Sequence, residues 1–298
     1  METQLPDKTK TLVQQFWNTN PCGSKFATQV IGSREFFAEI ESHRYRSEWH
    51  IPRTVGFERW SGREVLEVGC GLGTDAVQFA RNGARYTGVD LTPRSIELTA
   101  LRFRQEKLNG RFLNADAENL PFPDDSFDLV YSHGVLHHTP NTERAIQEVH
   151  RVLNPGGQAM IMLYHRRSYN YYGNIMFLRR LGARLLAFNG GRRLVARMTG
   201  EPLASVEVRA RVMQLDPKTF WQKQHFLSDN TDGAGNPVSK VFTRAEAGRM
   251  FNDFAQVRTS VRFLNKRWVP LFGPYLPRAM DGALGRLCGW HLWIFAKK

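Results

Sequence analysis

The sequence predicts an α/β protein whose core is a mostly parallel sheet with a reversed last strand, preceded by a helical cap and followed, after the fifth strand, by a helical insertion. Three observations lead to this fold class. Short β-branched runs alternate with longer helical patterns between residues 63 and 163, as in βαβ units. The first run leads into a glycine-rich loop at 69–73, and the alternation stops after residue 165.

Capping and stop residues set the limits of the elements in this region. Thr92 can cap a helix and Pro93 can occupy its first turn. Another helix ends at the Asn-Pro-Gly-Gly run of 154–157. We therefore expect strands at 64–69, 84–90, 111–116, 127–133 and 158–164, with helices at 74–82, 92–108 and 142–153.

The chain beyond residue 165 follows a different pattern. Residues 166 to about 240 contain arginines and aromatics but no comparable strand. After them, a capped helix is predicted at 243–254, strands at 256–265 and 289–296, and a loop or helical stretch at 267–286. The predicted organisation is a helical cap (1–60), a cofactor-binding core (61–165), a basic helical insertion facing the substrate (166–240) and the C-terminal part of the core (241–298).

Composition narrows the class of protein. The 298 residues are 42% hydrophobic and 23% charged, which suits a globular core. The polar start METQLPDKTK lacks the apolar stretch of a signal peptide, and no run reaches the roughly 18 apolar residues that span a bilayer. The cysteines Cys22, Cys70 and Cys288 form no CxxC pair, so neither a disulfide framework nor a zinc site is predicted. We expect a soluble, cytoplasmic protein.

Charge is distributed unevenly along the chain. Residues 1–165 carry 18 basic and 20 acidic side chains, whereas 166–298 carry 23 basic and only 8 acidic ones, a net +15. Such asymmetry is typical of a surface that meets an anionic partner, such as a phospholipid headgroup, a nucleic acid or an acidic substrate. A basic face that is merely solvated is the alternative.

The glycine-rich loop is the first candidate site. Gly69, Gly71 and Gly73 follow a predicted strand and precede a helix, so a ligand can approach the backbone closely there. The nicotinamide fingerprint needs its third glycine one residue later. Tight βα turns also use glycines, so the loop alone identifies no ligand.

Further segments of the chain indicate which ligand the glycine-rich loop binds. Residues 67–75, EVGCGLGTD, resemble the first motif of class I S-adenosylmethionine-dependent methyltransferases, which have a Rossmann-like fold. YTGVD (86–90), ADAENLP (115–121), FDLVYS (127–132) and LNPGG (153–157) are similar to that family's later motifs and occur in the same order. The core is similar to the methyltransferase type 11 group, which includes quinone-pathway C-methyltransferases.

The resemblance implies that S-adenosylmethionine is the cofactor. It implies that Asp90 binds both ribose hydroxyls, that Asp116 takes the adenine amino group, and that Ala117 offers its backbone amide. Structural roles stay open for Glu67, as a turn cap, and for Asp128, as a packing residue. The predicted cofactor-binding residues are Glu67, Gly69, Cys70, Gly71, Gly73, Asp75, Asp90, Leu91, Asp116, Ala117, Ser132 and His133.

Three histidines follow the fourth predicted strand. Methyl transfer from a sulfonium is an in-line displacement, in which the protein aligns the reactants and removes a proton where the acceptor carries one. His133, His137 and His138 are therefore candidate general bases. The competing interpretation makes the Leu-His-His turn a structural, cofactor-lining element. His133 and His137 also have metal-ligand spacing, but no third ligand is evident, so no metal is predicted.

Aromatic and basic residues outside the core motifs are candidates for the acceptor. Tyr45 and Arg46 lie in the predicted cap, and Tyr164, His165 and Tyr169 follow the fifth strand. In the cap, a hydrophobic helix packed on the sheet edge is an equal alternative.

The insertion contains a basic amphipathic pattern. Its arginines lie largely off one apolar stripe, formed by Ile175, Phe177, Leu178, Leu181, Leu185 and Phe188. Such a helix can rest on an anionic membrane or pack its stripe onto the core. The leading hypothesis is a small, hydrophobic or lipid-like acceptor, with peripheral contact to an anionic membrane. The alternatives are an RNA methyltransferase, although an Asn/Asp-Pro-Pro-Tyr motif is absent, and a non-catalytic cofactor-binding module.

Overall fold

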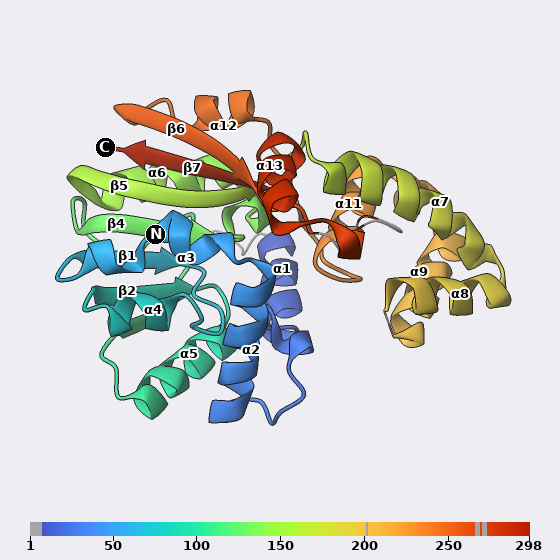
Figure 1. The fold of residues 1–298 in the computed structure, drawn as a ribbon, viewed down its shortest axis with the longest axis horizontal. Helices are drawn as coiled ribbons and strands as arrows, with labels where there is room; N and C mark the ends of the chain where they lie inside the picture. Colours follow the sequence, from blue (N-terminus) through green and yellow to red (C-terminus); the bar gives the residue numbers. More distant parts are fainter. Residues whose placement is uncertain (1–7, 201, 266–268, 270–272) are drawn as a thin grey trace.

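The computed structural model describes residues 8–200, 202–265, 269 and 273–298. Its centre is a seven-stranded sheet of order β3-β2-β1-β4-β5-β7-β6 (Figure 1). Strands β1 to β5 are mutually parallel, and β7 is antiparallel to both of its neighbours, β5 and β6. The predicted reversed last strand is therefore confirmed. The strands are β1 Glu64–Val68, β2 Arg85–Asp90, β3 Arg111–Asn114, β4 Phe127–His133, β5 Leu153–Tyr164, β6 Gln256–Arg262 and β7 His291–Lys297.

The helices of the core begin where the capping residues predict. The Thr92 hydroxyl accepts the backbone N–H of Ser95 at the start of α5, and Thr243 forms a capping box with Glu246 at the start of α12. One prediction was wrong: β5 already begins at Leu153, so the Asn-Pro-Gly-Gly run belongs to the strand. The helices of the core are α4 Ala76–Arg81, α5 Pro93–Glu106, α6 Thr142–Val152, α12 Arg244–Met250 and α13 Arg278–Cys288.

Alternate residues of each strand pack into two separate cores. On one face, Val65 and Leu129 pack with residues of α3 (His50–Val55) and α4 such as Ile51 and Phe79. On the other face, Leu66 and Val130 join residues of α6 and α12. Both faces of the sheet are thus covered, as parallel strands require.

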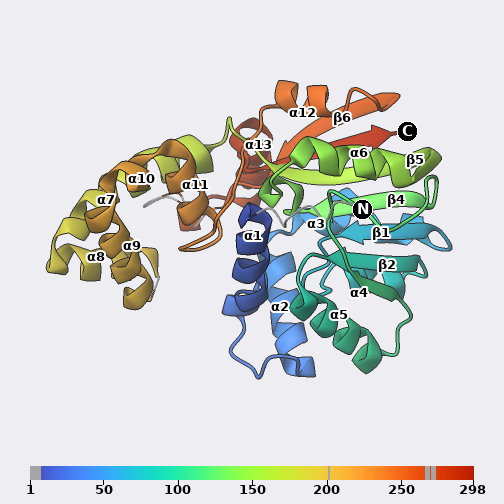
Figure 2. The same cartoon turned by 180° about the vertical axis from the view of Figure 1, so that it is seen from behind.

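The segment before the sheet forms α1 (Lys8–Thr19), α2 (Arg34–Ser47) and α3 (His50–Val55). The Ser33 hydroxyl caps α2 by accepting the backbone N–H of Phe36. In Figures 1 and 2, α1 and α2 lie beside the sheet at the side from which the insertion extends.

The insertion is helical, as predicted, and projects away from the sheet as an arm (Figures 1 and 2). We use "the arm" for residues 170–231. A π-helical segment, Asn170–Arg179, continues into α7 (Arg180–Ala183). The remaining helices of the arm are α8 Asn189–Thr199, α9 Leu203–Leu215, α10 Pro217–Trp221 and α11 Lys223–Thr231. None of the described helices is both long and apolar enough to cross a bilayer.

Candidate functional site

The glycine loop after β1 adopts a backbone that other residues rarely adopt. Gly69, Gly71 and Gly73 have φ values of +83°, +55° and +71°. A Cβ on Gly69 would lie 2.2 Å from Val135 Cγ2, and one on Gly73 would lie 2.9 Å from Thr99 Cγ2, whereas a Cβ on Gly71 would meet nothing within 4 Å. Gly69 and Gly73 are therefore needed for packing, and Gly71 faces open space.

Asp90 at the end of β2 holds this loop. Its Oδ2 accepts the backbone N–H of Gly71 at 3.0 Å, and its Oδ1 accepts the N–H of Thr92 at 2.9 Å. Burial raises the pKa of the Asp90 carboxyl, and these hydrogen bonds oppose that shift. The Thr92 hydroxyl lies 2.8 Å from Oδ1 and 2.7 Å from Ser95 Oγ, so its proton has an alternative acceptor. Asp90 thus retains capacity to accept further donors on both oxygens.

The loop after β3 faces the N-terminal helix. Lys10 of α1 contacts Asp116 Oδ2 at 2.5 Å and Glu118 Oε2 at 2.8 Å. Gln14 of the same helix donates to the carbonyl of Leu91 at 2.7 Å. These contacts hold α1 over the ends of β2 and β3.

Asp75, just after the glycine loop, is the centre of a buried polar cluster. Arg44 binds it with two nitrogens, at 3.1 and 2.6 Å, while Tyr45 and Tyr131 donate their hydroxyls at 2.8 and 2.7 Å. Burial alone would raise the pKa of Asp75, but Arg44 and the two hydroxyls outweigh it and hold the pKa below its ordinary value. All of its visible capacity is used within the protein, so Asp75 fixes the orientation of Arg44.

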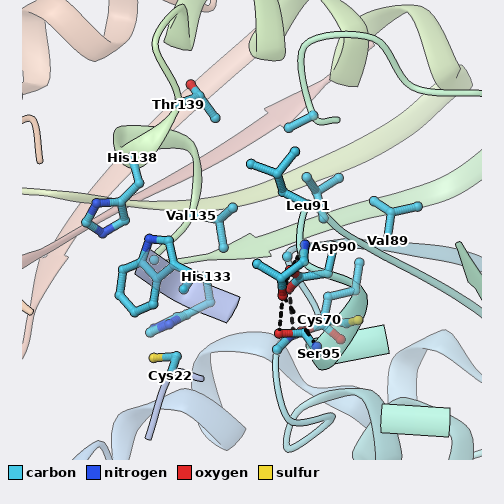
Figure 3. Close-up of a pocket in the computed structure, with 18 of the residues that line it drawn as sticks. Cys22, Cys70, Val89, Asp90, Leu91, Ser95, His133, Val135, His138 and Thr139 are labelled. Carbon is cyan, nitrogen blue, oxygen red and sulfur yellow. Dashed lines mark hydrogen bonds between the residues drawn. The ribbon is translucent and has the colours of Figure 1, made fainter. Parts of the chain in front are cut away.

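A cavity lies where these segments meet, at the carboxyl ends of the parallel strands, the usual ligand position in such sheets. Figure 3 shows Asp90 on one side of it and His133 and His138 on the other. Its apolar lining includes Val68, Leu91 and Val135. Of the predicted cofactor-binding residues, those that line it are Glu67, Gly69, Cys70, Gly71, Asp75, Asp90, Leu91, Asp116, Ala117 and His133.

Glu67 is more than a turn cap. Its buried carboxylate accepts the Tyr86 hydroxyl at 2.6 Å. Burial raises its pKa well above the ordinary glutamate value, and the nearby Asp75 adds to that shift. Asp128 has the structural role that the sequence left open, because it accepts the backbone N–H of Glu64 and the side-chain amide of Asn154.

Two predicted cofactor residues do not line the cavity. Gly73 lies against Thr99, and Ser132 is fully buried, with its hydroxyl donating to the Val68 carbonyl at 2.9 Å. The structure thus gives both residues roles within the protein: Gly73 allows close packing, and Ser132 ties β4 to β1.

The three candidate histidines have different environments. His137 is fully buried outside the cavity lining, with its ring 3.7 Å from that of Tyr164. His138 lines the cavity, but its Nδ1 lies 2.5 Å from the Val238 carbonyl and its Nε2 3.3 Å from Asp232 Oδ2. Both nitrogens of His138 therefore lie close to oxygen atoms of the protein. This geometry favours the alternative interpretation, in which His137 and His138 have structural roles, and leaves His133 as a candidate base.

The predicted acceptor residues lie outside the cavity lining. Tyr45 donates to Asp75, and Tyr164 donates to Asp232 at 2.8 Å. His165 is buried against the Gly289 carbonyl, and Arg46 is exposed to solvent. Tyr169 is half-buried at the base of the arm. The choice of Arg46 was wrong, because helix α2 turns its side chain away and turns that of Arg44 inward.

Sequence reasoning missed several residues that line the cavity, among them Lys10, Cys22 and Arg44. All three belong to the N-terminal segment, which carries no motif of the resemblance. The only available signal was the density of aromatic and basic residues around α2. That signal locates the segment but not the side chain.

Comparison with known proteins shows which family this region is similar to. Residues 66–161 match the family model described as a methyltransferase domain. The chain is 46% identical over 98 residues, 32% of its length, to the phthiotriol/phenolphthiotriol dimycocerosates methyltransferase of Mycobacterium tuberculosis, and the match covers 36% of that relative. It is 34% identical over 115 residues, 38% of its length, to sterol 24-C-methyltransferase ERG6B of Gibberella zeae, covering 30% of that protein. The matches thus span only about a third of these curated relatives.

Solved structures extend the likeness over almost the whole chain. The magnesium protoporphyrin IX methyltransferase ChlM of Synechocystis PCC 6803 superimposes with a TM-score of 0.53 at 13% identity, covering 98% of this chain and 100% of that one. The [4+2]-cyclase SpnF gives 0.52 at 16% identity, covering 99% and 97%. At such identities the likeness shows the fold alone, and this fold occurs in a cyclase as well as in a methyltransferase.

Proposed function

Because residues 66–161 are a methyltransferase domain of the type 11 group, we propose that this chain transfers a methyl group from S-adenosylmethionine to a small, hydrophobic acceptor by in-line displacement. The match confirms the predicted resemblance for the core. The activity of the whole chain, the identity of its acceptor and its contact with a membrane are what we propose.

One observation carries the proposal: Asp90, Gly71 and Asp116 surround the same cavity. Asp90 has acceptor capacity for two adjacent ribose hydroxyls, and Gly71 leaves the space beside it open. Asp116 has the acceptor oxygens for an adenine amino group; in this structure Lys10 contacts its Oδ2 and the backbone N–H of Glu118 donates to its Oδ1. These three residues end or follow the neighbouring strands β1, β2 and β3.

Arg44 completes the fit at the other end of the cavity. Its guanidinium lines the cavity beside His133 and is oriented by Asp75. Nε and Nη2 of Arg44 are engaged by Asp75 and His133, so Nη1 remains to donate to a second carboxylate. We assign to Arg44, in place of Arg46, the contact to the methionine carboxylate. When bound there, S-adenosylmethionine supplies an electrophilic methyl group, and the chain's part is to align the acceptor and receive its proton.

An aromatic side chain that packs against His138 favours a hydrophobic acceptor. The Trp17 ring lines the cavity and packs edge-on against His138 at 5.3 Å. The two relatives compared above are named for a dimycocerosate and a sterol, which are lipids. Both lines of support agree with a hydrophobic, lipid-like acceptor.

The arm also favours contact with an anionic membrane surface. Of the predicted apolar stripe, only Ile175 is fully buried, whereas Phe177, Leu181 and Phe188 are 65%, 51% and 68% exposed. The stripe is therefore not packed onto the core. Exposed arginines such as Arg193 and Arg197 belong to the same arm, and this combination of apolar and basic groups suits the boundary between headgroups and acyl chains.

Methyl-labelled S-adenosylmethionine tests the activity directly. The protein should label a component of a lipid extract, and separated small-molecule and RNA fractions run in parallel should stay unlabelled. Labelled RNA would favour the RNA methyltransferase alternative. Tight cofactor binding without transfer to any fraction would favour the non-catalytic module.

A further inference from the structure

Helix α1 runs along the cavity. Lys10 and Trp17 both line the cavity, and they lie almost two full turns apart on the same face of the helix. This spacing separates their Cα atoms by about 10 Å along the helix axis. Lys10 contacts Asp116, which marks the proposed adenine end, whereas the Trp17 ring packs against His138. The cavity therefore continues for about two turns of α1 beyond the contact with Asp116.

The end of the cavity at His138 is lined by Trp17, Cys22 and His138, and we call it the far end. Figure 3 shows Cys22 and His138 on the side of the cavity opposite Asp90. Trp17 is half-buried and Cys22 is exposed to solvent, so the far end opens to the outside. An indole ring in an open cavity keeps apolar surface in contact with water, and a ligand that covers this surface gains hydrophobic free energy.

The far end lies at the root of the arm. The arm starts shortly after Tyr164, the last residue of β5, and its last helix, α11, ends immediately before Asp232. Asp232 accepts the Tyr164 hydroxyl at 2.8 Å and lies 3.3 Å from His138 Nε2. Lys25, three residues beyond Cys22, donates to the Asp232 carbonyl at 3.4 Å. In Figures 1 and 2, α11 lies beside α1, so the far end faces the arm.

The first helical segment of the arm, Asn170–Arg179, carries exposed apolar side chains. Tyr172 and Phe177 are 53% and 65% exposed. Apolar surface of the arm therefore begins close in the chain to the end of β5. A lipid at a membrane surface on which the arm rests meets this segment first.

From this arrangement we propose that the far end is the acceptor subsite and that a lipid-like acceptor enters it from the arm side, with its apolar part against Trp17. The inference rests on the methyl transfer proposed above. The cofactor contacts assigned to Asp90, Asp116 and Arg44 leave the far end free for a second ligand. An in-line displacement needs that ligand aligned with the methyl group and the sulfur. Trp17 and Cys22 are thus specificity-determining residues supplied by the N-terminal segment.

The methionine part of the cofactor is the competing occupant of the far end. Arg44 can pair with its carboxylate, whereas Trp17 offers an apolar ring and Cys22 a thiol. Partial exclusion of water raises the pKa of the Cys22 thiol to about 11, and Asp232 adds to this shift, so the thiol is neutral near pH 7. Neither Trp17 nor Cys22 carries a charge that could bind an amino acid, and this chemistry favours an apolar ligand.

Trp17→Ala tests the subsite, with Leu12→Ala as the matched control, because Leu12 is a 54% exposed apolar residue of the same helix and is not part of the cavity lining. We expect the concentration of lipid extract that gives half-maximal methyl transfer to rise about tenfold or more in Trp17→Ala. S-adenosylmethionine affinity, measured by calorimetry without lipid, should change less than about threefold. Leu12→Ala should match the wild type in both measurements.

Alkylation of Cys22 tests the same subsite without changing the fold. N-ethylmaleimide should add to Cys22 in the folded wild type, slowly because the thiol is neutral and faster in mildly alkaline solution. The alkylated protein should bind S-adenosylmethionine within about threefold of the untreated protein and lose about 90% or more of its transfer to the lipid extract. Cys22→Ser, treated in the same way, should keep its transfer, because Cys70 is buried and Cys288 is half-buried.

Three results would overturn the inference: a Cys22 thiol that does not react in the folded protein, an alkylated protein that labels lipid at the normal rate, or one that no longer binds the cofactor. The last result would place the methionine part of the cofactor at the far end. An unchanged lipid requirement in Trp17→Ala would also contradict the subsite. A wild type that labels no lipid would instead overturn the proposed function, and this inference with it.

Discussion

The backbone N–H of Gly71 donates to the Asp90 carboxylate across 3.0 Å, so the acid of β2 holds the loop that follows β1. This bond joins the two features that the sequence singles out first. It gives Asp90 two tasks, because the same carboxylate shapes the glycine loop and presents acceptor oxygens to the cavity.

The two glycines at 69 and 71 should respond differently to alanine. Gly71→Ala should cost about 1–2 kcal/mol of stability for its left-handed backbone, since its new methyl group meets no atom within 4 Å. Because that methyl group enters the cavity, the affinity for S-adenosylmethionine should fall tenfold or more. Gly69→Ala should cost about 2–5 kcal/mol, because its Cβ also overlaps Val135. Urea unfolding and calorimetry measure both effects, and equal stability losses would contradict this account.

Asp75→Asn should strongly destabilise the protein. Without the carboxylate, the Arg44 charge loses its bidentate partner in a buried site, at a cost of about 3–5 kcal/mol. The pKa of Asp75 is lowered in the folded state, so its stabilisation is complete above the ordinary value of 3.8 and is lost as pH falls below it. The stability difference between wild type and Asp75→Asn should therefore shrink in acid. The exposed Asp253→Asn is the control and should show no such difference at either pH.

His137→Ala should act on stability rather than on chemistry. The ring is fully buried, 4.3 Å from that of His138 and 3.7 Å from that of Tyr164, and its removal should cost about 2–4 kcal/mol. Transfer per folded molecule and cofactor affinity should stay within threefold of the wild type. A stable variant with a hundredfold slower rate would restore His137 as the base.

The exposed stripe of the arm should carry membrane binding. Phe177→Ser combined with Phe188→Ser should reduce sedimentation with phosphatidylglycerol vesicles about tenfold or more, since each phenylalanine contributes on the order of 1.5 kcal/mol or more when buried in lipid. Val30→Ser, at an 80% exposed apolar position outside the arm, is the matched control and should bind normally. Binding should also weaken with salt. Equal binding of both variants would contradict the assignment of this surface.

The sequence predicted the core well because its signals are local. The strand at 127–133 has the bounds of β4, and Thr92 caps α5 as expected. Asp90 and Asp116 were located because their segments resemble the family's motifs, and they meet because the carboxyl ends of adjacent parallel strands share one edge of a sheet. Each of these predictions depends on spacing within a single βα unit.

The features that the sequence did not predict depend on contacts between distant segments. His137 and His138 are neighbours in one short turn, yet only His138 faces the cavity, and no pattern in the sequence distinguishes them. Arg44 was missed in favour of Arg46 because the direction of helix α2 over the sheet decides which of the two points inward. Glu48 lies beside His133 only because of the fold, since the two residues are 85 positions apart in the chain. The Asn-Pro-Gly-Gly run joined β5 because Leu153 pairs with Phe127 of β4.

Calorimetric titration of S-adenosylmethionine into the wild type and into Asp90→Ala tests the central claim most directly. The wild type should bind one equivalent, and Asp90→Ala should lose a hundredfold or more in affinity, because it removes both the ribose acceptors and the bond that holds Gly71. Folding of the variant is checked by circular dichroism in the same samples. Absence of wild-type binding, or equal affinity in a folded Asp90→Ala, would contradict the account.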